Sequence, residues 1–391
     1  MSVDSVKQAR IQSIDLLRGV VIIIMALDHV RDYFHADSLL FAPEDLHQTT
    51  PIIFFTRWIS HFCAPVFVFL AGTSAFLSGQ RKTKRQLSRF LLTRGLWLMI
   101  LEITIVNFAW SFNVELPFIG LAVIWVLGLS MIALAAIIHL RLNLGLALGL
   151  VLVCGHNLLD NVHFDGFFWS LLHETKIFRV DENHLVRVAY PVLPWIGIMI
   201  LGYNFGRLYT KDCSTEKRKK WLLIIGGGAT ALFIVIRAIN IYGDPAAWSN
   251  QSSVTFMVLS FLNTTKYPPS LLYTLMTLGP ALLFLALTEK VSGGFARAII
   301  HFGRVPMFFY ILHLYLIHFI AMFAAEFSGF DWTDMILQRR TWTDPQLKGY
   351  GFSLGVTYVI WIGIILLLYP LCRWYDTYKS AHKEKWWLSY L

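Results

Sequence analysis

The chain is dominated by long apolar runs that are separated by short polar connections. A run of about 20 apolar residues is long enough to cross the hydrocarbon core of a bilayer as an α-helix. Ten such runs are present, at residues 14–34, 56–79, 87–108, 117–139, 142–161, 187–208, 221–242, 269–288, 302–325 and 350–372. The sequence therefore predicts an all-α, polytopic integral membrane protein with about ten transmembrane helices.

The composition also indicates that the partner of this chain is a lipid bilayer. Hydrophobic residues make up 56% of the chain and charged residues 15%, and the mean hydropathy is +0.58, which is far from a soluble average. The net charge of +9 would suit a nucleic acid, but the basic residues fall between the apolar runs, so we expect no nucleic-acid binding. The four cysteines are scattered without metal or disulfide spacing, and we expect no metal.

The distribution of basic residues predicts the orientation. If the N terminus is cytoplasmic, 20 of the 33 Lys and Arg residues lie in cytoplasmic segments and nine lie in outer connections. This bias satisfies the positive-inside rule with both termini inside. We expect one domain over 1–391, with a cytoplasmic segment at 1–13 and a cytoplasmic tail at 373–391. The first run lacks a small-residue cleavage site and should be retained as a helix.

The stretch SIDLLRGVVIIIMALDH in the first apolar run carries Asp15, Arg18, Asp28 and His29. Arg18 and His29 are eleven residues apart, or three helical turns plus about 20°, so they share one helix face. At 1.5 Å per residue they lie about 16 Å apart in depth. Such residues are costly inside a membrane and usually face a bundle interior or a wet cavity.

Three arginines share a predicted depth near the cytoplasmic face, namely Arg18, Arg94 and Arg304. Arg binds phosphate oxygens in bidentate geometry, so this ring is a candidate site for a phosphorylated cytosolic donor. The alternative is structural: Arg94 can extend to the headgroups, and Arg18 can pair with Asp15 one turn earlier.

Titratable groups lie deeper in the predicted membrane. The candidates for catalysis are Asp28, His29, His61, Glu102 and His313. His is the natural general base near neutral pH, and a carboxylate beside it would orient the ring. Asp28 points about 100° away from His29 around the helix, which leaves Glu102 as the alternative partner. For each His, the structural alternative is a hydrogen-bonded core residue.

Five blocks of sequence carry a resemblance to a known family. They are SIDLLRGVVIIIMALDH, HFCAPVFVFLAGTSAFL, YPVLPWIGIMILGYNFGRLY, FLNTTKYPPSLLYTLMTLGP and FGRVPMFFYILHLYLIH. Together they resemble the heparan-α-glucosaminide N-acetyltransferase-like family of bacterial membrane proteins. The Arg-x10-His element also resembles the wider superfamily of transmembrane acyltransferases that acetylate surface polysaccharides.

The resemblance implies a membrane acetyltransferase, in the inner membrane of a bacterium. Acetyl-CoA or another acyl-CoA would enter from the cytosol, and a hydroxyl or amine of a glycan or other small acceptor would receive the acyl group on the outer side. Arg18 would help to hold the donor. The catalytic histidine would be His29 by the superfamily pattern, or His35 by the pattern of the lysosomal enzyme, whose histidine follows the first helix.

A rival function from another class also fits the intramembrane His, Asp and Glu residues. Secondary transporters that are coupled to protons use the same residue types in the membrane. The sequence does not decide between a monomer and a homodimer.

Overall fold

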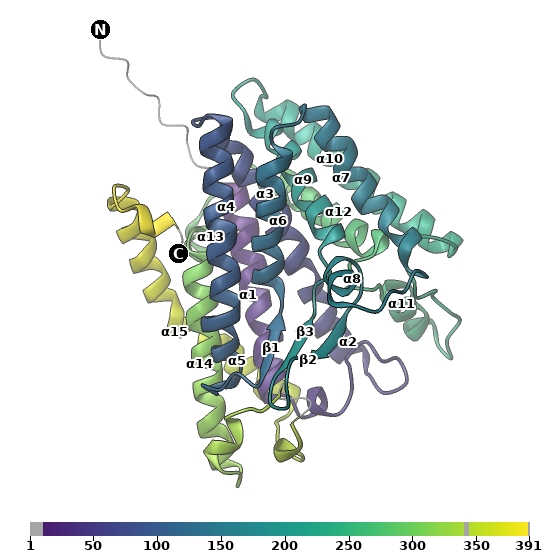
Figure 1. Ribbon diagram of the computed structural model, residues 1–391, viewed down its shortest axis with the longest axis vertical. Coiled ribbons are helices and arrows are strands. Elements are labelled where there is room, and N and C mark those ends of the chain that lie inside the picture. The colour runs from purple at the N-terminus through teal and green to yellow at the C-terminus, as the bar shows by residue number, and fades with distance from the viewer. Residues whose placement is uncertain (1–10, 340–343, 390–391) are drawn as a thin grey trace.

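The computed structural model describes residues 11–339 and 344–389. Figure 1 shows a bundle of helices with a small sheet at one end. The first half of the chain forms α1 (Gln12–Phe34), α2 (Pro51–Trp58), α3 (Cys63–Gly79), α4 (Lys84–Leu101), α5 (Asn107–Ser111), β1 (Phe118–Leu121), α6 (Val123–Ile137), α7 (Leu142–Gly155), α8 (Phe167–Leu172), β2 (Lys176–Arg179) and β3 (Leu185–Val188).

The second half forms α9 (Leu193–Phe205), α10 (Thr215–Ile239), α11 (Val254–Leu262), α12 (Leu271–Thr288), α13 (Gly294–Arg304), α14 (Pro306–Phe327) and α15 (Leu354–Ala381). Short 3-10 helices lie at Ala36–Leu39, Ile59–Phe62, His156–Leu159, Gly206–Tyr209, Trp332–Met335, Pro345–Leu347 and Trp386–Ser389. Each predicted apolar run thus contains a helix. The N-terminal segment up to residue 10, with Lys7 and Arg10, lies outside the described residues, as does Arg340.

Seven helical stretches within the described residues are long and apolar enough to cross a membrane: 51–79, 84–111, 142–159, 215–239, 271–288, 306–327 and 354–381. The three remaining predicted runs hold α1, which carries the buried charges, and the shorter helices α6 and α9. The chain is therefore an all-α polytopic membrane protein. The number of about ten spans stays a prediction.

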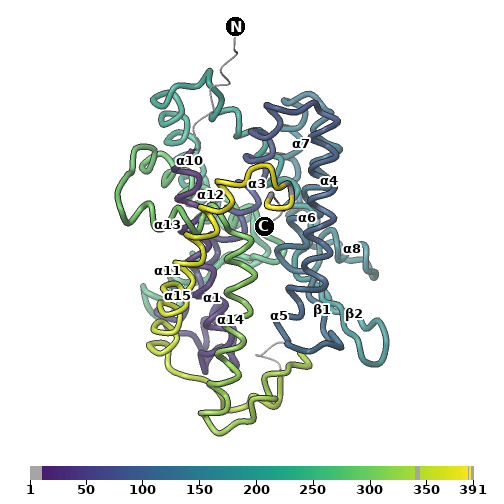
Figure 2. The backbone as a smooth tube through the Cα atoms, turned by 90° about the vertical axis from the view of Figure 1, so that its left-hand side faces the viewer, coloured from purple at the N-terminus to yellow at the C-terminus, as the bar shows by residue number. Residues whose placement is uncertain are grey.

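The bundle is organised around α1. This helix packs against α3, α12, α13, α14 and α15, and Figure 2 shows α13, α14 and α15 on its side of the molecule with α4, α6 and α7 opposite. Most of its side chains are buried, including those of Asp15, Asp28 and Arg31. The charged residues of the first apolar run therefore face protein, as their cost in lipid requires.

The structure differs from the arrangement of helices and loops predicted by the sequence at three places. Strands β1, β3 and β2 form a small sheet, in which β1 pairs with β3 in parallel and β2 pairs with β3 antiparallel. The predicted run 302–325 is interrupted, because α13 ends at Arg304 and Pro306, which cannot continue a helix, starts α14. Residues 373–381, expected in the tail, continue α15 and bury Asp376.

Small residues allow two pairs of helices to approach closely. A Cβ atom added at Gly202 in α9 would overlap the carbonyl oxygen of Phe69 in α3, and one at Gly303 in α13 would overlap the carbonyl oxygen of Asp15 in α1. Close backbone contact through glycine is typical of helix packing in membranes. At the second contact, Arg18 Nη1 donates to the carbonyl oxygen of Gly303, the residue before Arg304, over 3.2 Å.

We expect Gly202→Ala to lower the free energy of unfolding by about 1–3 kcal/mol, because the added methyl group overpacks a backbone contact. Gly228→Ala in α10 is the matched control, since a Cβ there meets no atom within 4 Å. The melting temperatures of the two variants in one detergent check the prediction. Equal melting temperatures would contradict it.

Candidate active site

A single cavity of about 1090 Å³ runs beside α1. One end, here called the arginine end, is lined by Arg18, Arg94 and Arg304. The other end, here called the loop end, is lined by Glu44, Arg187 and Lys266, from connections and from β3. Arg18 and His29 are eleven positions apart on α1, which sets the distance between the arginine end and His29 at about 16 Å.

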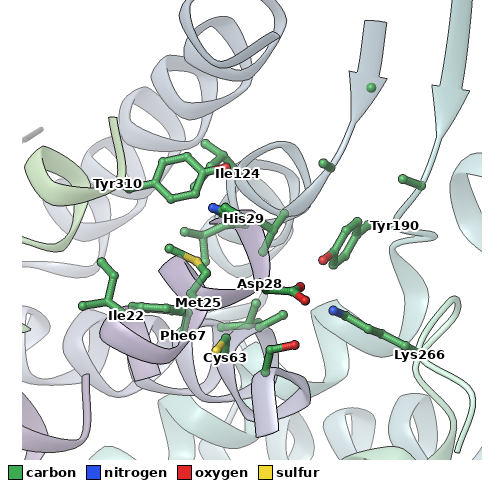
Figure 3. A pocket seen from close by; sticks show the side chains of 18 of the residues that line it. Ile22, Met25, Asp28, His29, Cys63, Phe67, Ile124, Tyr190, Lys266 and Tyr310 are labelled. Carbon is green, nitrogen blue, oxygen red and sulfur yellow. The ribbon is translucent and has the colours of Figure 1, made fainter. Parts of the chain in front are cut away.

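Apolar side chains line the middle of the cavity. Figure 3 shows Ile22, Met25 and Phe67 on one side, while Asp28 and Lys266 extend toward one another on another side. The cavity is therefore polar toward both ends and largely apolar between them, which suits a ligand with charged and apolar parts.

Two of the three arginines at the arginine end share a carboxylate. Arg18 donates from Nη1 to Asp15 Oδ1 over 3.2 Å and from Nη2 to Ser74 Oγ over 3.3 Å. Arg304 lies 3.4 Å from the other Asp15 oxygen and 3.4 Å from Asp376 of α15. Buried charges need such partners.

Arg94 lies over the ring of Phe90, with its Cζ atom 5.8 Å from the ring centroid. The guanidinium is held there by a cation–π contact, while the side chain also lines the cavity. The three arginines that were predicted at one depth are thus brought to one end of one cavity.

His29 lines the cavity near Tyr310 (Figure 3) and contacts a second histidine. Nδ1 of His313 lies 2.9 Å from the carbonyl oxygen of Phe309. Because a carbonyl only accepts, this nitrogen carries a hydrogen, and Nε2 of a neutral His313 is an acceptor. Nδ1 of His29 lies 2.7 Å from that Nε2 and donates to it. In neutral His29 the basic lone pair is therefore on Nε2.

This contact corrects the expectation that a carboxylate would orient His29. Asp28, on the adjacent helix face, is held by Arg31 of α1 at 3.0 Å and by Arg57 of α2. Glu102 caps the start of α6, where its Oε2 accepts hydrogen bonds from the amides of Ile124 at 2.9 Å and Trp125 at 3.2 Å. An interhelical histidine contact cannot be read from spacing along one helix.

The remaining histidine candidates do not line the cavity. His35 follows α1, is buried beneath the backbone of Phe352, and has Nε2 3.8 Å from Asp37. Burial lowers the pKa of His35. His61 is buried with Nε2 3.4 Å from Glu44. Of the predicted catalytic groups, only Asp28 and His29 lie on the cavity wall itself, with His313 behind His29.

An ion-pair network that sequence patterns did not predict lies at the loop end. Arg57 donates from Nε to Glu44 Oε1 over 2.7 Å and also pairs with Asp28, while Arg31 pairs with Asp32 at 2.7 Å. Arg31 and Arg57 are among the nine basic residues that the sequence assigns to the outer connections. The i,i+3 spacing of Asp28 and Arg31 was the one available signal.

The network shifts the titration of its loop member. Burial raises the pKa of Glu44. The guanidinium of Arg57 and a hydrogen bond from His61 together lower it by more than burial raises it, so that the pKa lies well below its usual 4.5. Glu44 is therefore ionised at neutral pH and connects the loop to the start of the second helical stretch.

A comparison with known families supports the earlier resemblance. The family described as heparan-alpha-glucosaminide N-acetyltransferase, catalytic, matches residues 10–242, more than half of the chain. The chain belongs to this family. The match contains Arg18, His29 and Arg94, and it ends before α13 and α14. No curated protein matches the chain.

Membership in the heparan-alpha-glucosaminide N-acetyltransferase family identifies the general activity as that of a transmembrane acetyltransferase. The cavity has two polar ends, and His29 lies on its wall between them. Each of these features lies on or beside α1, the helix with which the family match begins.

We expect Glu44→Gln to lower the free energy of unfolding by about 1–2 kcal/mol at pH 7, because Arg57 loses a charged partner. The folded-state pKa of Glu44 is depressed, so its stabilisation is complete above 4.5 and is lost as the pH falls through the lower folded value. Melting temperatures of wild type and variant should therefore converge below pH 4.5.

The exposed Glu182 in the loop between β2 and β3 provides the control. Glu182→Gln should have the same melting temperature as wild type at pH 7 and below pH 4.5. A Glu44→Gln difference that persisted unchanged at the lowest pH would contradict the assignment of the stabilisation to an ionised Glu44.

Proposed function

We propose that this protein moves an acetyl group from cytosolic acetyl-CoA to a hydroxyl or amine of a sugar-like acceptor on the outer side of the membrane. The observation that carries the proposal is one cavity with an arginine end, an apolar middle and a loop end, and with His29 on its wall. The proposal places the arginine end and both termini in the cytoplasm, as the charge bias predicts.

The arginine end suits the phosphates of CoA. Arg18, Arg94 and Arg304 offer planar donors for phosphate oxygens, and Lys379 of α15 adds a fourth cation. The apolar stretch around Met25 and Phe67 would cover the uncharged pantetheine arm and bring the thioester toward His29. Charged and apolar parts of the donor thus meet matching walls.

His29 is proposed as the general base. Its Nε2 would take the proton of the acceptor hydroxyl or amine while that oxygen or nitrogen bonds to the thioester carbonyl carbon. The C–S bond then breaks, and the CoA thiolate recovers the proton from the imidazolium. His313 would hold the ring through Nδ1 and stabilise the charged form, and Tyr310 would donate its hydroxyl to the developing oxyanion.

The loop end would admit the acceptor. Asp28, Glu44 and Tyr190 offer hydrogen-bond acceptors or hydroxyl groups around the opening, and sugar hydroxyls bind such groups. The ion pairs with Arg31 and Arg57 hold the carboxylates in place. Asp28 is therefore proposed to position the acceptor rather than to remove its proton.

We expect His29→Gln to reduce acetyl transfer by about 10²–10⁴-fold, the usual contribution of a general base. His35→Gln is the matched control and should retain turnover, because His35 does not line the cavity. Release of CoA from acetyl-CoA by purified protein with a mixture of amino sugars measures both. Loss of turnover in His35→Gln alone would overturn the assignment.

We expect Arg94→Gln to raise the KM for acetyl-CoA by roughly 10- to 100-fold, as for one charged hydrogen bond, with kcat nearly unchanged. Arg141→Gln, an exposed arginine before α7, is the control. Binding of acetyl-CoA to detergent-purified protein gives a second readout. No saturable binding, together with counterflow of an unmodified solute in vesicles, would favour the transporter instead.

A further inference from the structure

A second polar cluster lies outside the cavity, where α7 ends. It consists of His156 and Asp160, which follow α7, and His173, which follows α8. One ligand atom from each residue lies within 4.8 Å of the other two, and Nε2 of His173 is 3.3 Å from Asp160 Oδ1. Two imidazoles and a carboxylate therefore converge on one point.

The burial of these groups is not balanced by hydrogen bonds within the described residues. His156 is 3% exposed, and neither of its ring nitrogens makes a hydrogen bond of normal geometry, although the backbone carbonyl of Pro269 lies close enough to the ring for a weak one. His173 is 2% exposed, and its Nδ1 is also without a hydrogen bond. Unsatisfied buried polar atoms are rare in proteins, and a bound ion is one of their ordinary explanations.

The carboxylate is held from behind. Asn157 donates from Nδ2 to Asp160 Oδ2 over 2.8 Å, and its own Oδ1 accepts from the amide of Leu271 at 2.9 Å. Oδ1 of Asp160 is thereby left to face the two histidines. Carboxylate ligands of metal sites are commonly fixed by such outer hydrogen bonds.

We propose that His156, Asp160 and His173 bind one Zn²⁺ ion. Neutral imidazole and carboxylate are ligands that zinc prefers, at about 2.0–2.2 Å, and three protein ligands leave a fourth position for water. Tetrahedral bonds of that length separate two ligand atoms by about 3.4 Å, close to the 3.3 Å between His173 and Asp160. His156, whose ligand atom lies within 4.8 Å of the other two, would need to move inward by at most about 1.4 Å.

The bound ion would join segments that lie apart in the chain. His156 and Asp160 end the α7 stretch, His173 precedes β2, and Asn157 reaches the start of α12. The sheet that follows carries Arg187 to the cavity. The zinc ion would therefore hold the sheet of β1, β2 and β3 in place. It would take no part in the acyl-transfer steps.

The test is metal analysis of the full-length protein, purified without a histidine tag and dialysed with Zn²⁺ at pH 7.5. Wild type should retain about one zinc per chain, as expected for a preformed site, and its melting temperature should rise on addition of Zn²⁺ but not of Mg²⁺. His156→Asn and His173→Asn should lose both responses.

His163→Asn is the matched control, because His163 is an exposed histidine of the same loop, paired with Glu174 at 2.6 Å. It should retain zinc as wild type does. Asp160→Asn keeps the size of the side chain and should retain less zinc even if a histidine variant fails to fold. No zinc above the blank in well-folded wild type, or equal zinc in wild type and His156→Asn, would overturn the proposal.

Discussion

The fold depends on the need to neutralise charges that α1 carries into the interior of the helix bundle. Asp15, Arg18, Asp28 and Arg31 are each too costly to leave in lipid. Partners come from distant parts of the chain: Arg304 reaches Asp15, and Arg57 reaches Asp28. Because these partners surround α1, the helix is central, and the polar groups beside it keep the adjoining space from filling with apolar side chains.

The sequence predicted the helices well and their interruptions poorly. Hydrophobic run length is a local property, so every predicted run contains a helix. The sheet of β1, β2 and β3 was missed because its strands are only four residues long and because β1 pairs with β3, which lies far along the chain. Pro306 was the signal for the break between α13 and α14, but the apolar residues around it obscured that signal.

The candidate site was predicted in part. Topology predicted that Arg18, Arg94 and Arg304 lie at equal depth on different helices, and the structure brings all three to one cavity. Asp28 and His29 line the same cavity. The contact between His29 and His313 joins residues 284 positions apart, and no spacing rule predicts such a pair. Glu44 lies in a loop whose path depends on Arg57, so its place at the cavity became clear only in three dimensions.

Glu102 has a consequence for how experiments on this family should be interpreted. It follows α4 in a π-helical stretch (Glu102–Val106) and supplies hydrogen-bond acceptors to a helix that begins at depth, where water cannot. Asn107 pairs with the backbone of Gly120, because its Oδ1 accepts from the Gly120 amide and its Nδ2 donates to the Gly120 carbonyl oxygen. Substitution of either residue removes hydrogen bonds to the backbone, so a loss of product in such a variant does not by itself identify a catalytic residue. Separating structural from catalytic losses requires a measure of folded protein for each variant.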